Sequence, residues 1–365
     1  MKIHIKGGRL IDPQNGIDAT QDIYIAAGKV VAIGAAPGGF CANRTLDATG
    51  KIVCPGLVDL SARLREPGFE YKATLASEMA AAAAGGVTSL ACPPDTDPPL
   101  DESGLVEMLK YRARSQNKAR VYPIGALTEG LKGAKLTEMA ELREAGCVAF
   151  SHADVPLTDH QVLYYALQYA ATFNIPVWLR PQDAALARGG VAHDGQVATR
   201  LGLPSIPVAA ETAALSVILL LARETGARVH LCRLSSAEGI NMVRRARHDG
   251  VLVTCDVAIH HLHLSEIDIG YFDPLCHVIP PLRSQRDRDA LRLALAEHAI
   301  DALCSDHCPV DDDAKQVPFS EAEPGATGLE LLLPLALKWA EEDKLPVSTA
   351  LARVTCDAAR ILGID

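Results

Sequence analysis

The sequence predicts an α/β protein in which a (β/α)8 TIM barrel follows a small β domain. From Cys54 onward, short apolar runs alternate with longer helical stretches, and eight such units can be counted. This alternation is typical of parallel βαβ units, and eight of them close into a barrel whose functional residues follow the carboxyl ends of the strands. The first fifty residues instead contain short alternating strands separated by turn signals, which predicts a small antiparallel β unit.

Three regions of the chain have distinct patterns. Residues 1–53 contain the strand-like stretches KIHIKGGRLIDPQNG, DIYIAAGKVVAIG and TLDATGKIV and form the N-terminal part of the expected small domain. Residues 54–345 form the expected barrel, and residues 346–365 form an expected C-terminal helix that leads back to the small domain. The barrel strands are expected at residues 52–60, 87–92, 120–124, 148–151, 176–180, 228–234, 251–257 and 302–305, each followed by a helix-like or loop segment.

Composition narrows the class of protein. The chain has 365 residues and 48% hydrophobic content, enough to bury a large core. A net charge of −10 and the lack of a basic stripe argue against a nucleic-acid or anionic-membrane partner. No run is long and apolar enough to cross a bilayer, and the first residues lead into a strand instead of a signal peptide, so we expect a cytoplasmic protein. Ten cysteines without CxxC pairs predict buried, reduced thiols.

The segment PGLVDLSARLREPG runs from a buried-strand pattern into a charged loop. Side chains two residues apart on a strand point to the same face, so Ser61 and Arg63 would lie together in the barrel mouth. The segment resembles the start of the barrel in dihydroorotases and related cyclic amidohydrolases, where it reads PGLVDLHVHLREPG and the two histidines bind zinc. A serine hydroxyl is a poor zinc ligand, and arginine stays protonated at any ordinary pH.

The resemblance extends to the other strand ends. VWLRPQD and VHLCRLSSAEG resemble the family motifs HAED and HxxHVS, which implies that Arg180 and Arg233 stand where the family has zinc-binding histidines. VAFSHADVP matches a stretch that carries aspartates or a carboxylated lysine, and His152 is its one potential ligand, with Asp154 two residues later. LCSDHCPV resembles TDHAPH and keeps Asp306, which matches the family's general base and metal ligand.

The positions that contact substrate in the family also differ. CPPDTDPPLD resembles the MPNTNP loop, with Asp95 in place of an asparagine that helps to hold the substrate carboxylate. Two carboxylates repel each other unless one is protonated, so this change argues against ordinary substrate binding. Ile279 and Val310 replace a polar contact and a histidine, whereas Arg65, which matches the family's other carboxylate-binding residue, remains.

Arginine stands at three of the metal-ligand positions: Arg63, Arg180 and Arg233. Guanidinium groups offer only N–H donors and a fixed positive charge, so they would repel a divalent cation. We infer that they take over the electrostatic task of the cations through charge-assisted hydrogen bonds to Asp306, Asp95 or Asp183. Without metal-activated water the site has no evident nucleophile. We therefore expect no metal, no cofactor and a degenerate site at Ser61, Arg63, Arg65, Asp95, His152, Arg180, Arg233 and Asp306.

Other interpretations apply at the same positions. A structural or surface role competes with a rebuilt zinc site for the histidines His152, His230, His260, His261 and His263. The arginines could bind an anion such as phosphate or carbamoyl phosphate. The run DDDAK at residues 311–315 is most simply a solvated loop, although in relatives this region lies over the active site, and Cys304 and Cys308 are most simply buried thiols.

The resemblance implies a non-catalytic dihydroorotase homologue in pyrimidine biosynthesis. Inactive dihydroorotase-like chains associate with the catalytic chain of aspartate transcarbamoylase and support its assembled, active form, so we expect that partner and an oligomer. The alternatives are an active amidohydrolase that uses Asp306 with His152 or His260 in a remodelled site, and an anion sensor.

The end of the chain also departs from the family pattern. In the family, the run that resembles TCDAARILGID is followed by strands that complete the small domain, whereas this sequence stops at Asp365. Either the sequence is truncated, or the small domain is incomplete and leaves a sheet edge open for association.

Overall fold

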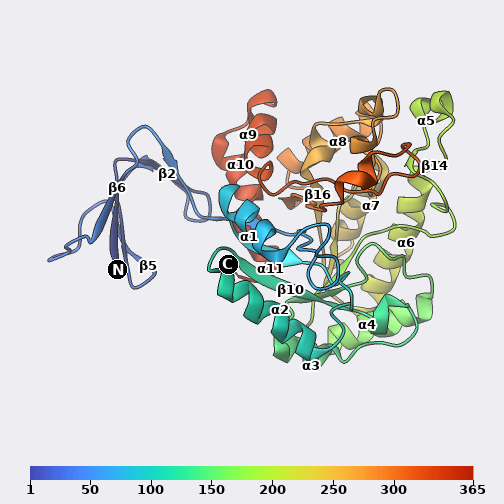
Figure 1. Cartoon of the computed structure of the whole chain (residues 1–365), viewed down its shortest axis with the longest axis horizontal. Helices are drawn as coiled ribbons and strands as arrows, with labels where there is room; N and C mark the ends of the chain where they lie inside the picture. Colours follow the sequence, from blue (N-terminus) through green and yellow to red (C-terminus); the bar gives the residue numbers. More distant parts are fainter. Residues whose placement is uncertain (365) are drawn as a thin grey trace.

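Eight parallel strands form the central sheet of the computed structural model, which describes residues 1–364 (Figure 1). Their order around the sheet follows their order in the chain, as the alternating pattern predicted. The predicted barrel is therefore confirmed. Its strands are β8 (Leu57–Asp59), β9 (Val87–Cys92), β10 (Arg120–Ala126), β11 (Ala149–Ser151), β12 (Val177–Leu179), β15 (Val229–Leu231), β16 (Val253–Ala258) and β17 (Ala302–Cys304).

The first and last strands of the barrel meet just beyond their carboxyl ends. Ala62 and His307 form a parallel bridge, in which the Arg63 amide donates to the His307 carbonyl at 2.9 Å. The buried Asp59 carboxylate reinforces this seam, because it accepts the Ser305 amide at 2.7 Å. Backbone and side-chain hydrogen bonds thus close the sheet where the ladder is interrupted.

The expected strand at residues 52–60 is wrong as a single element. Residues Ile52–Val53 form β7, which pairs with β2 (Arg9–Asp12) in the small domain, and only β8 belongs to the barrel. Pro55 and Gly56 separate the two, because proline lacks an amide donor and interrupts a ladder. At Gly56 a Cβ atom would lie 2.1 Å from Thr88 Oγ1, so the chain passes too close to β9 for a side chain.

Helices cover the outside of the barrel (Figure 1). Several begin at a side-chain cap that satisfies free amides, for example Thr74, Asp159, Ser236 and Ser284. The helices are α1 (Leu75–Ala84), α2 (Ser103–Gln116), α3 (Met139–Ala145), α4 (His160–Thr172), α5 (Gln196–Leu201), α6 (Val208–Thr225), α7 (Ala237–His248), α8 (Gln285–Ala296), α9 (Leu332–Glu342), α10 (Val347–Arg353) and α11 (Cys356–Leu362).

Shorter elements lie in the loops. A two-stranded parallel sheet and α5 form an insertion between β12 and α6, and short 3-10 helices follow several strands. These elements are β13 (Ala192–His193), β14 (Ser205–Ile206), η1 (Glu129–Leu131), η2 (Ile259–Leu262), η3 (Glu266–Ile269), η4 (Pro274–Cys276) and η5 (Asp312–Lys315).

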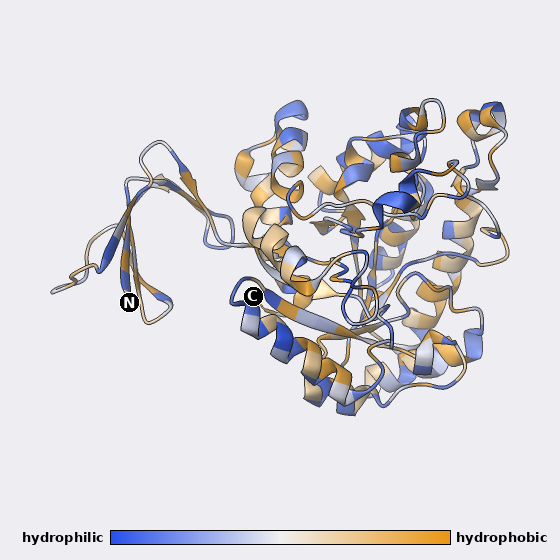
Figure 2. Ribbon diagram, in the orientation of Figure 1, coloured by the Kyte–Doolittle hydropathy of each residue, from blue (hydrophilic) through white to orange (hydrophobic). Residues whose placement is uncertain are grey.

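The apolar core has two layers. The larger one fills the space between strands and helices, and the smaller one fills the interior of the barrel, where Trp178 and Ile124 pack against Ala358 and Leu362 of α11. Figure 2 shows apolar residues concentrated on the strands and the inner faces of the helices. Because α11 closes one end of the barrel, the mouth at the carboxyl ends of the strands remains for function.

The small domain comprises a four-stranded and a three-stranded sheet that stand apart from the barrel (Figure 1). The antiparallel prediction is only partly right: β1 pairs antiparallel with β4 but parallel with β6, and β2 pairs parallel with β7. Long connections to β6 and β7 allow these parallel pairs. The remaining bounds are β1 (Lys2–Lys6), β3 (Ile17–Thr20), β4 (Ile23–Ala26), β5 (Lys29–Ile33) and β6 (Arg44–Asp47).

The C-terminal segment contributes helices to the barrel. Among residues 1–364, no strand after β17 joins the small domain, and α10 and α11 pack on barrel elements instead. One side-chain hydrogen bond from this segment to the small domain joins Arg360 Nη2 to Gln14 Oε1 at 3.3 Å.

Two sequence expectations concern the whole chain. In the part of the chain that the structure describes, no helix has the length and apolar character needed to span a membrane. All ten cysteines are free, but the expectation that they are buried holds for four of them only: Cys92, Cys147, Cys255 and Cys304 are buried, Cys41 is exposed, and the other five are half-buried.

Candidate functional site

Three guanidinium groups meet at the barrel mouth around one carboxylate, that of Asp154. Arg63 Nη2 lies 2.5 Å from Asp154 Oδ2, whereas Arg180 Nε and Arg233 Nη2 lie 2.6 and 2.5 Å from Oδ1. The arginines follow β8, β12 and β15, and Asp154 follows β11. We call Arg63, Arg180 and Arg233 the arginine cluster.

Two further carboxylates complete the charge balance. Asp95 Oδ2 accepts from Arg63 Nε at 2.7 Å, and Asp306 Oδ1 accepts from Arg233 Nη1 at 2.8 Å. The arginine side chains are only 4–5% exposed, whereas Asp95 and Asp154 are 24% and 30% exposed, so the cations are buried and two of their carboxylate partners reach toward solvent. Three cations therefore face three carboxylates inside the mouth.

The pKa values of the two central carboxyl groups shift in opposite directions. Burial disfavours ionisation of Asp154, but the charges of Arg233, Arg63 and Arg180 outweigh it and hold the Asp154 pKa far below its ordinary value. At Asp306, burial dominates over the nearby guanidiniums and raises the pKa. Asp154 is thus the firmly ionised centre of the cluster.

The sequence-based choice of partners was right for Asp95 and Asp306 and wrong for Asp183. Asp183 Oδ1 accepts the amides of Ala185 and Leu186 at 3.0 and 2.8 Å, so it stabilises its own loop. Asp154 takes its place because the loop after β11 turns inward. The sequence feature that could have identified Asp154 as the shared partner is its position as an acidic residue just beyond the end of a strand.

Left-handed backbone conformations direct several of these side chains. Ala153, Arg233 and Asp306 have φ values of 50°, 56° and 48°, although none is glycine. This conformation costs roughly 1–2 kcal/mol per residue for L-amino acids and often marks a functional site. Arg233 and Asp306 are both held in this conformation within the ion pairs described above.

Ser61 and Arg65 lie at the edge of the cluster. Ser61 Oγ is 3.5 Å from Asp306 Oδ1, a weak contact. Arg65 Nε donates to the Pro309 carbonyl at 2.8 Å, and its Nη2 contacts Cys308 Sγ at 3.1 Å. The Arg65 guanidinium therefore holds the loop after β17.

Most of the histidines are engaged outside the cluster. His152 bonds to Thr128 Oγ1 and to the Val155 carbonyl at 2.9 and 2.8 Å. His230 and His261 likewise have partners on a neighbouring strand and loop, and His263 contacts the Leu335 carbonyl of α9. Burial lowers the pKa of His260 to about 4 and that of His261 to about 3, so both are neutral at neutral pH.

The side chains present do not fit the zinc centre of the resembled family. Zinc needs three or four lone-pair donors in tetrahedral reach, and the expected ligand positions hold Ser61, Arg63, Arg180 and Arg233. Among residues 1–364, no group of three or more His, Cys, Asp or Glu side chains is arranged to hold a metal ion.

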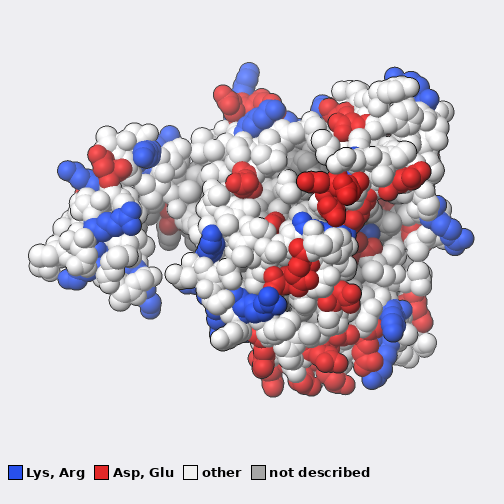
Figure 3. Space-filling model, in the orientation of Figure 1, with Lys and Arg blue, Asp and Glu red and all other residues white. Residues whose placement is uncertain are grey.

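The segment at residues 311–315, expected to be a solvated loop, is partly ordered as a short helix. Within the expected DDDAK loop, η5 forms, and Lys315 Nζ donates to the carbonyls of Pro274 and His277 at 3.0 and 3.1 Å. Figure 3 shows acidic side chains spread over the visible face of the barrel, with basic ones between them.

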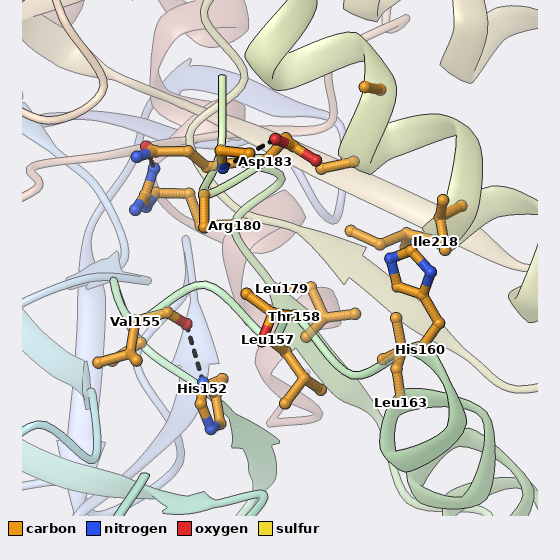
Figure 4. Close-up of a pocket in the computed structure, with 17 residues that line it drawn as sticks. His152, Val155, Leu157, Thr158, His160, Leu163, Leu179, Arg180, Asp183 and Ile218 are labelled. Atoms are coloured by element: carbon orange, nitrogen blue, oxygen red, sulfur yellow. Dashed lines mark hydrogen bonds between the residues drawn. The ribbon is translucent and has the colours of Figure 1, made fainter. Parts of the chain in front are cut away.

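Two spaces adjoin the cluster. A cavity of about 30 Å³ is lined by Arg63, Asp154, Arg233, His260 and Asp306, among others, and has about the volume of one water molecule. A larger groove of about 340 Å³ lies between α4 and α6 (Figure 4). We call it the α4–α6 groove.

An eight-stranded parallel barrel with a small β domain and these strand-end motifs defines the class of cyclic amidohydrolases related to dihydroorotase and hydantoinase. Residues 50–239 match the family described as dihydro-orotase-like. The chain belongs to this dihydroorotase-like family.

Individual relatives agree with this assignment. The chain is 48% identical over 362 residues to a dihydroorotase-like protein of Pseudomonas aeruginosa, covering 99% of this chain and 86% of the relative. It is 42% identical over 368 residues to a dihydroorotase of Geobacter sp. strain M21, covering 100% and 86%. Among solved structures, the L-hydantoinase (dihydropyrimidinase) of Arthrobacter aurescens superimposes with a TM-score of 0.87 at 25% identity, covering 99% of this chain and 82% of that one.

Proposed function

We propose that this protein is a non-catalytic dihydroorotase homologue that serves as a structural subunit of aspartate transcarbamoylase in pyrimidine biosynthesis. The observation that supports the proposal is the ion-paired arginine cluster at the positions of the metal ligands. In this role the barrel supports the assembly and activity of the partner instead of converting a substrate itself.

Two features of the arginine cluster oppose hydrolysis: its positive charge and the small space that it leaves in the barrel mouth. A bound cation lowers the pKa of water and supplies the nucleophile in metal-dependent hydrolases, whereas fixed guanidinium charges repel a cation. Asp306 at the general-base position is paired with Arg233, and a cavity of about 30 Å³ leaves no room for a cyclic amide.

The partner rests on the resemblance to inactive dihydroorotase-like chains that associate with the catalytic chain of aspartate transcarbamoylase. A rigid barrel whose own site is closed suits such a scaffold role. The relevant measurement is copurification of this protein with that catalytic chain, together with transcarbamoylase activity in the presence and absence of this gene. We expect a stable complex and a fall in activity on deletion; clean separation at micromolar concentration contradicts the proposal.

A second candidate is an active cyclic amidohydrolase with a remodelled site. It is favoured by one observation, that His260 and Asp306 line the same cavity. Metal analysis of the purified protein and assays with dihydroorotate and N-carbamoyl-aspartate distinguish the two. Stoichiometric zinc with turnover establishes the second candidate, and their joint absence supports the first.

A further inference from the structure

Asp154 approaches the arginine cluster from the side of the solvent. Its side chain is 30% exposed, whereas the arginines that hold it are 4–5% exposed. It is carried by the loop between β11 and α4, and its carbonyl also accepts from Arg180 Nη2 at 2.8 Å. The carboxylate therefore enters a cationic pocket from outside, as a bound ligand would.

The pocket retains donors that Asp154 does not satisfy. Arg63 Nη1 and Arg233 Nε are buried and have no hydrogen-bond partner, although Arg63 Nη1 lies within ion-pair distance, 3.5 Å, of Asp306 Oδ1. Both residues line the cavity of about 30 Å³, as does Asp154. Buried donors are normally paired, and a guanidinium pairs best with a planar oxyanion that offers two oxygens. Removal of the Asp154 carboxylate would join its volume to the cavity and make room for a free carboxylate with a methyl group.

A second space, the α4–α6 groove, lies on the other side of the same loop and reaches Arg180 of the cluster. Val155, Leu157 and Thr158 line the α4–α6 groove, and Arg180 lies at one end of it beside Asp183 (Figure 4). Apolar side chains from α4 and α6, such as Leu163 and Ile218, form its wall. A small carboxylate with an apolar body could therefore reach Arg180 from the groove.

We propose that the arginine cluster is a binding site for small carboxylates, and that Asp154 is its tethered occupant, which a free carboxylate must displace. The side chain competes at the high effective concentration of an attached group. The proposal concerns the pocket alone and does not depend on the transcarbamoylase partner.

The test is rescue of an Asp154→Ala variant by acetate. Thermal unfolding is followed at constant ionic strength while sodium acetate replaces sodium chloride. We expect the unfolding midpoint of the variant to rise saturably, by about 2 °C or more at ~10 times the Kd, because acetate binds the folded state alone. The wild type should respond far less, since Asp154 already fills the pocket.

A matched control is Asp159→Ala, which also removes one carboxylate from this loop but only from the cap of α4. It should be destabilised without an acetate response, and uncharged acetamide should rescue neither variant. An equal response of the control or of the wild type contradicts the proposal, as does no response of Asp154→Ala.

The Asp154→Asn variant covers the case in which Asp154→Ala does not fold. It keeps the shape of the side chain and loses the charge, so the amide should be displaced by acetate more readily than the native carboxylate. If the variant unfolds at the same temperature in acetate and in chloride, the cluster is not a carboxylate site. If acetate stabilises it, adding Arg180→Gln should weaken the response.

Discussion

Arg233 links the two central carboxylates of the mouth, because its guanidinium contacts Asp306 Oδ1 at 2.8 Å and Asp154 Oδ1 at 2.5 Å. A buried cation shared by two anions is more costly to remove than either anion alone, because both carboxylates lose a partner. The cluster is therefore held together by its arginines, and Arg233 is the natural place to test this.

We expect Arg233→Met to lower the free energy of unfolding by about 3–5 kcal/mol, the range observed when one partner of a buried ion pair is removed. Asp306→Asn should cost less, because Arg233 keeps its contact with Asp154. The double variant should be more stable than the sum of the two changes predicts, since Asp306 is then no longer a buried charge whose nearest guanidinium has been removed and whose remaining partner, Arg63 Nη1, lies 3.5 Å away. Chemical denaturation of the four proteins provides the measurement, and strict additivity would argue against coupling.

The buried histidines predict a loss of stability in acid. The pKa of His261 is about 3 in the folded protein and 6.5 in the unfolded chain, so the unfolded state takes up the proton first. The stabilisation by neutral His261 is complete above pH 6.5 and falls as the pH drops toward 3, by about 3 kcal/mol at pH 4.

A His261→Gln variant should flatten this pH dependence. Glutamine can still donate to the Pro281 carbonyl, which His261 Nε2 contacts at 3.2 Å, but it does not titrate. The measurement is the unfolding midpoint between pH 7 and 4. His248→Gln is the control, because His248 is 90% exposed, and it should leave the curve unchanged. If the unfolding midpoint of His261→Gln falls as steeply with decreasing pH as that of the wild type, the acid destabilisation does not come from His261.

Asp59, at the seam of the barrel, should make the protein less stable as the pH rises, which is opposite to the effect of the buried histidines. Burial raises the pKa of Asp59 to about 6, although Ser305 donates to it from its amide and its hydroxyl. Below its unfolded pKa of 3.8 this group contributes its full stabilisation, which is lost as the pH rises through 6.

Loss of a donor should make the ionised Asp59 more costly. We expect Ser305→Ala to lower the free energy of unfolding by about 1–3 kcal/mol, and by more at pH 8 than at pH 5. Ser115→Ala, on the exposed face of α2, is a control that should change stability little. Denaturant unfolding at the two pH values tests the prediction, and an effect of Ser305→Ala that is equal at both would contradict it.

The sequence was sufficient for the barrel because its strands are short apolar runs separated by helices, a pattern that depends on local residues alone. It also placed Arg63, Arg180 and Arg233 at strand ends, which topology brings together. It did not reveal Asp154 as their shared partner, since the reach of a loop depends on backbone angles such as the positive φ of Ala153. The parallel pairing of β6 and β7 was likewise missed, because pairing across long connections leaves no local pattern.

Restoring the metal ligands should make the protein depend on zinc. A variant that carries Ser61→His, Arg63→His, Arg180→His and Arg233→His has lone-pair donors around Asp306 but no cation beside Asp154. Without metal, the buried Asp306 and the partly exposed Asp154 lose their cationic partners, and the variant should be markedly destabilised. Zinc bound by the histidines supplies the missing positive charge, so the unfolding midpoint should rise with zinc concentration.

The partial variant Ser61→His and Arg63→His is the matched control. It keeps Arg180 and Arg233, whose charges repel the cation, and therefore should neither retain zinc nor gain stability from it. Metal content after dialysis and thermal unfolding with and without zinc compare the two proteins. If the fourfold variant is as stable as the wild type in a chelator, the arginines are not the electrostatic substitute for a metal, because the carboxylates of the mouth then tolerate the absence of any cation.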